Sequence, residues 1–417
     1  MSKSKQSKPS KLTFEDGFDE NGYFDTTILE KMYPDARYYF IVGGRSFGKT
    51  YPTIRHAIED SLAGKGAFAY IRRYKEDISD TNLQDLLAPH KDWMETMTQG
   101  QYNDFQYYRH RWTPVQMGWQ SHPRSENMEP TWERIAKAPE AIGGSWSLST
   151  YARSKGQDFG FDKGGIKHII LDEAVEPNGA YINDEWKAWT NTISTLIRQN
   201  DNDTKIWLLA NPVSKYVCPY FRNMGIKKSW LQTPGITEIV YPADEDGHQM
   251  KAIFCYLGTK DDKEDTKKQS VKDKRKTIEQ RYFAFPNSKG ITRSITSGAW
   301  ELADANCMTK GMYENSREIY KLYLLLDEDI LCAELLCYKD QVYYIFVRPS
   351  SKLPENTYYS CLIPRPDPYA IIGGDTGHPL TEVYNRIIRT RQVYYSDLTT
   401  ADLFRGWMLE ATKMKRI

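Results

Sequence analysis

The stretch YYFIVGGRSFGKT, residues 38–50, constrains the fold of this chain more than any other part of its sequence. An apolar run is followed by GGRSFGKT, which fills every fixed position of the phosphate-binding pattern G-x-x-x-x-G-K-[ST]. In this pattern a buried strand leads into a glycine-rich loop, and a helix begins where the loop ends. The sequence therefore predicts a strand over 38–42, a helix from Thr50 to about Leu62, and a nucleotide site between them.

The loop combines backbone and side-chain chemistry suited to holding ATP and Mg²⁺. Its glycines let backbone N–H groups turn toward the phosphates, because glycine carries no Cβ that would block the approach. Lys49 is expected to reach the β- and γ-phosphates, and the hydroxyl group of Thr50 is expected to bind the metal. The residues expected to bind the nucleotide are Gly43, Gly44, Arg45, Ser46, Phe47, Gly48, Lys49 and Thr50.

Further apolar runs predict the rest of a sheet. AFAYIRR at 67–73, GGIKHIILDEA at 164–174 and TKIWLLANP at 204–212 each contain a short continuous apolar segment. Such runs, separated by helical or loop segments, are typical of a parallel sheet that is covered on both faces. We therefore expect an α/β domain with the parallel sheet of a P-loop NTPase, RecA-like or of the additional-strand type. Residues 100–135, rich in Tyr, Trp, Arg, His and Pro, favour no single type of element.

Polar residues at the ends of two of these runs predict the hydrolytic chemistry. Asp172 ends the run IILD, where it can hold Mg²⁺ beside the phosphate loop. Glu173 follows it and is expected to orient and polarise the attacking water. Asn211 ends the next run and is expected to sense the γ-phosphate. The Asp-Glu pair indicates an ATP hydrolase, whereas a GTPase would carry the guanine-reading pattern N-K-x-D, which the sequence lacks.

Composition limits the other functional classes. Lys and Arg total 56 against 55 for Asp and Glu, so the formal net charge of +1 neither favours nor excludes nucleic acid, and any basic surface must be local. No apolar run approaches the ~20 residues that a membrane span needs, and the start MSKSKQSKPSK has no apolar segment of a signal peptide. The six cysteines have no metal-binding spacing, so we expect them to be reduced and buried in a cytosolic protein.

Changes in composition along the chain predict its domain organisation. GTKDDKEDTKKQSVKDKRKT, from Gly258 onward, is almost entirely charged or polar and has no apolar face. After it, residues 319–349 have the pattern of a β-meander, and the end of the chain pairs a strand with a helix whose start, Thr399 and Asp402, resembles a capping box. The predicted divisions are a lead-in at 1–35, an ATPase domain at 36–257, a linker at 258–300 and a C-terminal domain at 301–417.

Four stretches in a fixed order resemble a known family. They are GGRSFGKT, AYIRRYK, YARSKGQDFGFDKGGIKHIILDEA and TLIRQNDNDTKIWLLANPVSKYVCPYF. Together they resemble the DNA-packaging ATPases of small tailed bacteriophages, which are relatives of the large terminase subunits and of ring-shaped DNA translocases. The resemblance covers about residues 36–222. Phosphate loops are shared by many ATPases, so the order of the four stretches makes the resemblance specific.

The resemblance implies a homomeric ring, a pentamer, that docks transiently on the portal vertex of a procapsid in the host cytoplasm. The ring would thread double-stranded DNA inward as ATP is hydrolysed, and it allows a packaging RNA as a further partner. By position, Arg198 matches the arginine that completes the site of a neighbouring subunit, and Arg45 is the alternative, acting within its own subunit. Arg72 and Arg73 end a predicted strand with alternating directions, so at most one of them faces the nucleotide.

DNA contacts in such a motor go mostly to phosphates, because packaging must ignore sequence. Arg153 and Lys155, in the loop before the acidic strand, are the first candidates. A second group of arginines lies among the aromatic residues of 107–124, where a solvent-exposed or intersubunit surface is the favoured interpretation: Arg109, Arg111 and Arg124.

The C-terminal domain has two interpretations under the same resemblance. In large terminases this domain is a ribonuclease-H-like nuclease that uses clustered carboxylates and two metals, and Asp327, Asp375 and Asp397 offer such a triad. The small-phage relatives instead have a nuclease-like domain that does not cut. Because the domain is short and Asp327 falls in a predicted turn, we expect a degenerate nuclease fold that docks to the portal, to DNA or to RNA.

Three functions therefore stay open at this stage. The first is an ATP-driven motor that packages double-stranded DNA through the portal, and the second is a complete terminase with an active two-metal nuclease. The third is an ATP-binding assembly switch with negligible turnover, which Glu173 argues against because a pure binder has no need of that carboxylate. A helicase would need a second set of motifs in the latter half of the chain, and none is evident there.

Overall fold

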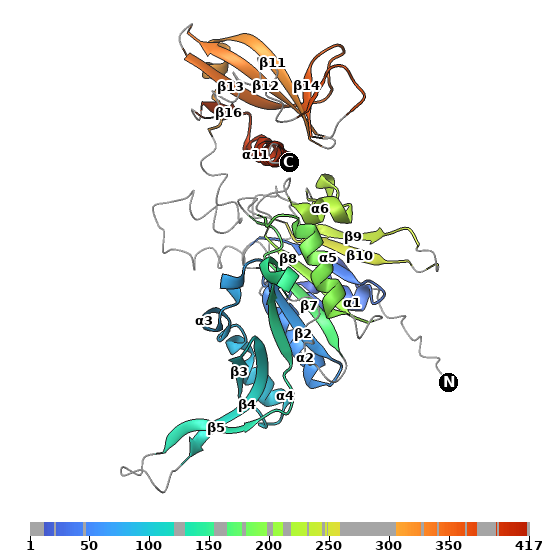
Figure 1. Cartoon of the computed structure of the whole chain (residues 1–417), viewed down its shortest axis with the longest axis vertical. Helices are drawn as coiled ribbons and strands as arrows, with labels where there is room; N and C mark the ends of the chain where they lie inside the picture. Colours follow the sequence, from blue (N-terminus) through green and yellow to red (C-terminus); the bar gives the residue numbers. More distant parts are fainter. Residues whose placement is uncertain are drawn as a thin grey trace, which may run out of the picture. The chain divides into compact units, whose positions relative to one another are not determined.

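The chain forms two compact units, each built on one β-sheet, and the two are described separately (Figure 1). The computed structural model describes residues 12–20, 22–44, 47–120, 130–153, 165–176, 181–197, 203–211, 218–231, 233–243, 247, 249–258, 306–326, 329–339, 342–362, 365–372, 389 and 392–414. The predicted linker at 258–300 lies almost entirely outside the described residues, so the predicted domain boundaries beside it stay predictions.

The first unit is built on a ten-stranded sheet in the order β3-β4-β6-β2-β7-β8-β1-β10-β9, with β5 paired to β4. From β6 to β10 every neighbouring pair is parallel, which confirms the predicted parallel α/β sheet. The strands are β1 Tyr38–Val42, β2 Ala67–Arg72, β3 Asp104–Tyr108, β4 Arg111–Gln120, β5 Thr131–Lys137, β6 Gly143–Ser147, β7 Ile166–Asp172, β8 Lys205–Ala210, β9 Gly235–Val240 and β10 Lys251–Tyr256.

Helices cover both faces of the central strands, because consecutive residues of a strand point to opposite faces. In β1, Tyr39 belongs to the same buried cluster as Ile54 and Ile58 of helix α2. The next residue, Phe40, instead packs against Phe221 of helix α6, with ring centroids 5.2 Å apart. Both faces of β1 are therefore buried, as its uninterrupted apolar sequence predicts.

The helix predicted after the phosphate loop is α2, Thr50–Leu62, and it begins and ends at the predicted residues. The other described helices of this unit are α1 Thr27–Met32, α3 Asp80–Leu83, α4 Lys91–Met97, α5 Glu185–Leu196 and α6 Pro219–Met224. Short 3₁₀ turns occur at η1 Phe14–Gly17, η2 Lys75–Ile78, η3 Ala88–His90, η4 Leu148–Arg153 and η5 Lys228–Leu231. In the part of the chain that the structure describes, no helix is both long enough and apolar enough to cross a bilayer.

Strands β3, β4 and β5 form an antiparallel arm at one edge of the first sheet (Figure 1). This arm contains most of the region 100–135, for which the sequence favoured no element. Strand β5 is exposed along almost its whole length, so it has no buried face to impose an alternating pattern on its sequence.

The second unit is built on a six-stranded sheet in the order β15-β14-β11-β12-β13-β16. Strands β11, β12 and β13 pair in antiparallel fashion one after another, which confirms the predicted meander, and β14 and β15 add parallel strands beside β11. This order fits the expected ribonuclease-H-like fold. The elements are α9 Lys310–Glu314, β11 Ser316–Leu326, β12 Asp329–Tyr338, β13 Val342–Ser350, β14 Tyr359–Cys361, β15 Ala370–Ile372, β16 Val393–Tyr395 and α11 Leu398–Met414.

Two smaller predictions are wrong in detail. Helix α11 is capped by Asp397 and not by Thr399, because the Asp397 carboxylate accepts a hydrogen bond from the backbone N–H of Thr400 at 2.8 Å. Thr399 lies inside the helix, which begins at Leu398. All six cysteines are free, as expected, but Cys307 is exposed and the other five are buried.

Candidate active site

A cavity of about 290 Å³ lies at the carboxyl ends of β1, β7 and β8. These strands are adjacent and parallel, and the carboxyl edge of a parallel sheet is where such folds bind ligands. Six residues that the sequence singled out come together here: Gly48, Lys49, Thr50, Asp172, Glu173 and Asn211. The other residues that line the cavity are Tyr23, Tyr51, Leu209 and Ala210.

The glycines of the phosphate loop allow close packing at two points. A Cβ on Gly43 would lie 2.7 Å from the Cβ of Leu257, so only glycine fits there without displacing the neighbouring chain. Gly48 has a φ of 80°, and a Cβ there would lie 3.1 Å from the ring of Tyr23. The lead-in segment thus packs directly on the loop. Sequence reasoning missed Tyr23, because its contact with Gly48 joins residues far apart in the sequence.

Two parts of the loop need separate comment. The side chain of Phe47 is buried in the hydrophobic core, so contact of this residue with a phosphate runs through its backbone. Arg45 and Ser46 lie outside the described residues, and their predicted contacts with the nucleotide stay predictions.

Lys49 joins the two sides of the cavity. Its side-chain ammonium group donates hydrogen bonds to the carbonyl oxygens of Gly43 at 2.7 Å and Gly44 at 3.0 Å. It also donates to Oδ1 of Asn211 at 3.1 Å. The lysine of the phosphate loop and the polar residue at the end of β8 are therefore in direct contact, although 162 residues separate them.

Thr50 and Asp172 provide a set of oxygen atoms suited to a small divalent cation. The Thr50 hydroxyl donates to Oδ1 of Asp172 at 3.3 Å, and the Tyr70 hydroxyl donates to Oδ2 at 2.9 Å. Burial raises the pKa of Tyr70 well above its usual value of 10, and the Asp172 charge adds to this, so the phenol stays a donor. Hydroxyl and carboxylate oxygens are the hard ligands that Mg²⁺ prefers, so these residues fit the metal.

Glu173 stands where β7 ends, with its backbone in the left-handed region at a φ of 57°. This conformation costs a residue other than glycine about 1–3 kcal/mol, and such strain is concentrated at functional sites. Its side chain is 52% exposed, and its carboxylate accepts a hydrogen bond from Nη2 of Arg72 at 2.7 Å. Nη1 of the same arginine lies 3.8 Å from Asp172. Arg72 therefore contacts both carboxylates.

Arg73 points the opposite way, as the alternation along β2 predicts. It is buried, and its guanidinium donates to both carboxylate oxygens of Glu185 in α5 at 2.9–3.1 Å. It also donates to the backbone carbonyls of Glu173 and Ala174, each at 3.1 Å. Arg73 thus holds the backbone of the catalytic candidate Glu173, a role that sequence reasoning missed because the partners are at least 100 residues away.

Several predicted functional residues are not placed at this site. Arg198 and Lys155 lie outside the described residues, and of Arg153 only the backbone, at the end of η4, is described. The roles of these three residues stay predictions. In the second group of arginines, Arg109 and Arg111 are exposed and belong to the β3–β4 arm, and Arg124 lies outside the described residues.

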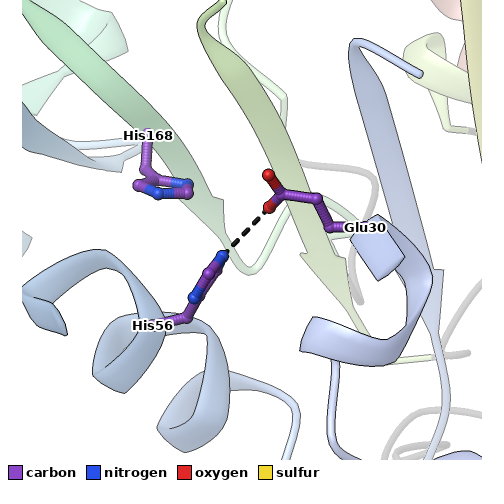
Figure 2. Close-up of side chains that lie close together, drawn as sticks. All are labelled: Glu30, His56 and His168. Carbon is purple, nitrogen blue, oxygen red and sulfur yellow. Dashed lines mark hydrogen bonds and ion pairs between the residues drawn. The ribbon is translucent and has the colours of Figure 1, made fainter. Parts of the chain in front are cut away.

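A second group of titratable residues, none of which lines the nucleotide cavity, is drawn in Figure 2. Glu30 of α1 and His56 of α2 point toward each other, with Oε2 and Nε2 3.0 Å apart, and the buried ring of His168 lies beside them. Sequence reasoning missed this group, because its members come from three separate elements.

The hydrogen bonds of His168 show what this group does. Trp207 donates its Nε1–H to Nδ1 of His168 at 3.1 Å, so Nδ1 is the acceptor and the ring proton sits on Nε2. Nε2 then donates to Asp60 at 2.9 Å. Both ring nitrogens of His168 are committed, and a metal would have to displace its proton and break the bond to Asp60. The group therefore connects α1, α2, β7 and β8 through hydrogen bonds.

Of the three carboxylates considered for a nuclease, one lies among the residues that the structure describes, so the assembly of such a triad stays a prediction. Asp397 is occupied in capping α11, and Asp327 and Asp375 lie outside the described residues. Glu334 of β12 is fully buried, but it is held by Arg348 at 2.7 and 2.9 Å and by Tyr313 at 3.1 Å.

Comparison with known proteins finds similarity to solved structures. No protein-family model matches the chain, and no curated protein matches it. Among solved structures, it is similar to the Phi-28 gp11 DNA packaging motor, at 16% identity and a TM-score of 0.46, with 95% of this chain and 99% of that chain covered. Because this identity is low, the chemistry of the site rests on the chain's own residues.

Two further solved structures are single domains. The N-terminal domain of the DNA packaging ATPase from bacteriophage phi29 is 16% identical at a TM-score of 0.39, and the match covers 57% of this chain and 98% of that one. The large terminase ATPase domain of a Thermus phage is 13% identical at a TM-score of 0.35, with 69% and 98% covered.

Proposed function

We propose that this chain is an ATP hydrolase that translocates double-stranded DNA and packages a viral genome into a procapsid through its portal. One observation carries the hydrolase assignment: Lys49, Thr50, Asp172, Glu173 and Asn211 surround a single cavity at the carboxyl edge of the parallel sheet. A protein that only binds ATP needs the first three, and Glu173 is the group that hydrolysis adds. The packaging role is supported by the ordered set of motifs in the sequence.

The residues divide into those that bind and those that act on water. Lys49 binds the β- and γ-phosphates, and the oxygens of Thr50 and Asp172 hold Mg²⁺. When bound, Mg²⁺ supplies positive charge that offsets the negative charge of the phosphate oxygens. Glu173 orients the attacking water and accepts its proton, and its half-exposed carboxylate is open to water at the cavity.

Two arginines position Glu173. Arg72 holds one oxygen of its carboxylate by a charge-assisted hydrogen bond, and Arg73 holds its backbone carbonyl. Asn211 touches Lys49, so a change in the contacts of that lysine with phosphate changes the end of β8 as well. This contact is the route by which we expect hydrolysis to reach the DNA-gripping part of the protein.

The finer parts of the proposal concern assembly. The subunits form a ring, a pentamer, on the portal vertex in the host cytoplasm, and Arg198 completes the site of the next subunit. An arginine supplied in this way increases the rate about 10³–10⁵-fold in related phosphoryl-transfer sites. The C-terminal unit docks to the portal, to DNA or to a packaging RNA and does not cut DNA. The capping role of Asp397 supports this, because it commits one of the three candidate carboxylates.

The test is the steady-state ATPase rate as a function of protein concentration, with and without long double-stranded DNA. For the wild type we expect a rate that rises more than linearly with protein and that DNA stimulates. Glu173→Gln and Arg198→Ala should each abolish it, whereas Arg222→Ala, which removes an exposed guanidinium from α6, should not. A rate that is linear in protein, indifferent to DNA and unchanged by Arg198→Ala would overturn the ring motor.

A further inference from the structure

A second hollow, of about 420 Å³, lies on the β3–β4–β5 arm and shares no residue with the nucleotide cavity. Three of its residues are cationic and exposed: Arg109, Arg111 and Lys137. No carboxylate is among the lining residues, but the exposed Glu140 lies in the chain between two of them, so the excess positive charge of this surface is smaller than three. The remaining lining residues are Gln106, Tyr108, Thr113, Pro139 and Ala141.

The fold brings these cations together from two connections of the arm. Tyr108 of β3 pairs with Arg111 of β4, so Arg109 and His110 form a two-residue turn. Both turn residues have positive φ values, 49° and 61°, in a position where Asn and Gly are usual. Lys137 ends β5 and lies opposite Val115 of β4. The turn and the end of β5 thus place three positive side chains around one hollow.

The chemistry of the hollow matches oxygen anions. Two guanidinium groups and one ammonium group offer charged donors, and Gln106 adds an amide that can donate. Tyr108 is 57% exposed and lies under the Arg109 guanidinium, 5.2 Å from its carbon. The chain as a whole is nearly neutral, so this cluster is a local concentration of positive charge of the kind that marks a nucleic-acid contact.

We propose that this hollow binds phosphate groups of the duplex DNA backbone and gives the motor a grip that is independent of sequence. The inference rests on the proposed function, which supplies the duplex as substrate. Phosphate contacts made by arginine and lysine fix a protein on DNA without reading bases, as packaging requires. The arm therefore joins the ATPase unit to the DNA at a place remote from the site of hydrolysis.

The experiment measures duplex binding by fluorescence anisotropy over a series of salt concentrations. The variant is Arg109→Ala/Arg111→Ala/Lys137→Ala, and the matched control is Lys187→Ala/Arg222→Ala/Lys227→Ala, which removes three exposed cations from α5, α6 and the loop after it. The slope of log K against log salt should become shallower by about 0.9 for each phosphate that the variant no longer neutralises. The control should keep the wild-type slope, and both proteins should keep the ATPase rate measured without DNA.

Further variants guard against a general folding defect. Arg109→Lys/Arg111→Lys keeps the charges and should keep most of the salt slope, and Arg109→Ala alone should make the slope shallower by about 0.9. The inference is overturned if the triple variant has the same slope as the wild type. It is also overturned if the control variant changes the slope as much as the triple variant does. The inference is also overturned if the triple variant loses affinity only for RNA duplexes of the same length. It is overturned as well if the variant changes only the competition of inorganic phosphate for the protein. If the wild type neither binds duplex DNA nor responds to it, the proposed function fails as well.

Discussion

At the scale of single residues, the candidate site depends on side chains that position the reacting groups as much as on the groups themselves. Asp172 receives one hydrogen bond from Thr50 and another from Tyr70, so both of its oxygens have a fixed partner. Removing a residue that holds a metal ligand in this way typically lowers the metal affinity by about 10–100-fold. Tyr70 is therefore a part of the site that can be tested alone.

We predict that Tyr70→Phe weakens the Mg²⁺ dependence of ATP hydrolysis. The change removes one hydroxyl and leaves the ring that packs in the core, so the fold is kept and Oδ2 of Asp172 loses its donor. The Mg²⁺ concentration for half-maximal rate should rise about 10-fold. Tyr107→Phe is the matched control, because its hydroxyl bonds Ser145 on the arm side of the sheet. An unchanged Mg²⁺ titration in Tyr70→Phe would contradict the prediction.

At the scale of elements, buried polar links connect the strands of the site to the helices around them. Arg73 and Glu185 are both nearly inaccessible to solvent, and Glu185 also accepts from Tyr220 of α6 at 2.8 Å. The network thus joins β2, the residue after β7, α5 and α6. Removing one partner of a buried ion pair leaves the other charge buried without compensation. This costs more stability than replacing both partners by apolar residues.

Glu185→Gln should destabilise the first unit by about 3–5 kcal/mol in urea unfolding, because the Arg73 guanidinium stays buried without its counter-charge. Replacing both partners, as Arg73→Met/Glu185→Leu, should recover part of this loss. The comparison is Glu238→Gln, which breaks a partly exposed pair with Lys251 in the same unit and should cost no more than about 1 kcal/mol. Equal costs for the buried and exposed changes would show that the network does not hold these elements together.

The link between α1 and α2 should depend on pH. Burial lowers the pKa of His56, but its hydrogen bond to Glu30 and the nearby charges of Glu30, Asp60 and Glu59 raise it above 6.5 overall. Because the pKa of His56 is raised in the folded state, its contribution to folding stability is fully present below pH 6.5. This contribution is lost as the pH rises through the pKa of the folded state.

The measurement compares the free energy of unfolding of the wild type with that of His56→Gln across pH 5.5–9. The contributions of other titrating groups, His168 included, cancel in the difference. The free energy of unfolding of the wild type should exceed that of the variant by about 1.5 kcal/mol at low pH, the typical value for a hydrogen bond to a charged group. The two free energies should converge at high pH. A difference that grows with pH would give the opposite sign and contradict the assignment of Glu30 as the partner.

The parts that the sequence predicted correctly are those decided by local pattern. Strand β1 and helix α2 begin and end as expected, because an unbroken apolar run and a complete phosphate-loop pattern specify them. The arm was not predicted, because β5 is exposed on both faces and β4 carries Pro114 and Gly118 within the strand. Long-range partners such as Arg73 and Glu185, which are 112 residues apart, leave no mark in a local pattern.

At the scale of the whole molecule, the proposal that sites act in a ring can be tested by mixing. If one inactive subunit stops a pentamer, a mixture with half Glu173→Gln subunits should retain roughly 3% of the wild-type DNA-stimulated rate, because few closed rings then contain only active subunits. Independent sites would instead retain about half, since each subunit would turn over alone. The same mixture made with Arg222→Ala, an active subunit by expectation, should show no loss. If the rate instead falls linearly with the fraction of Glu173→Gln subunits, the coupled ring is contradicted. The hydrolase assignment, which rests on the cavity residues, would still hold.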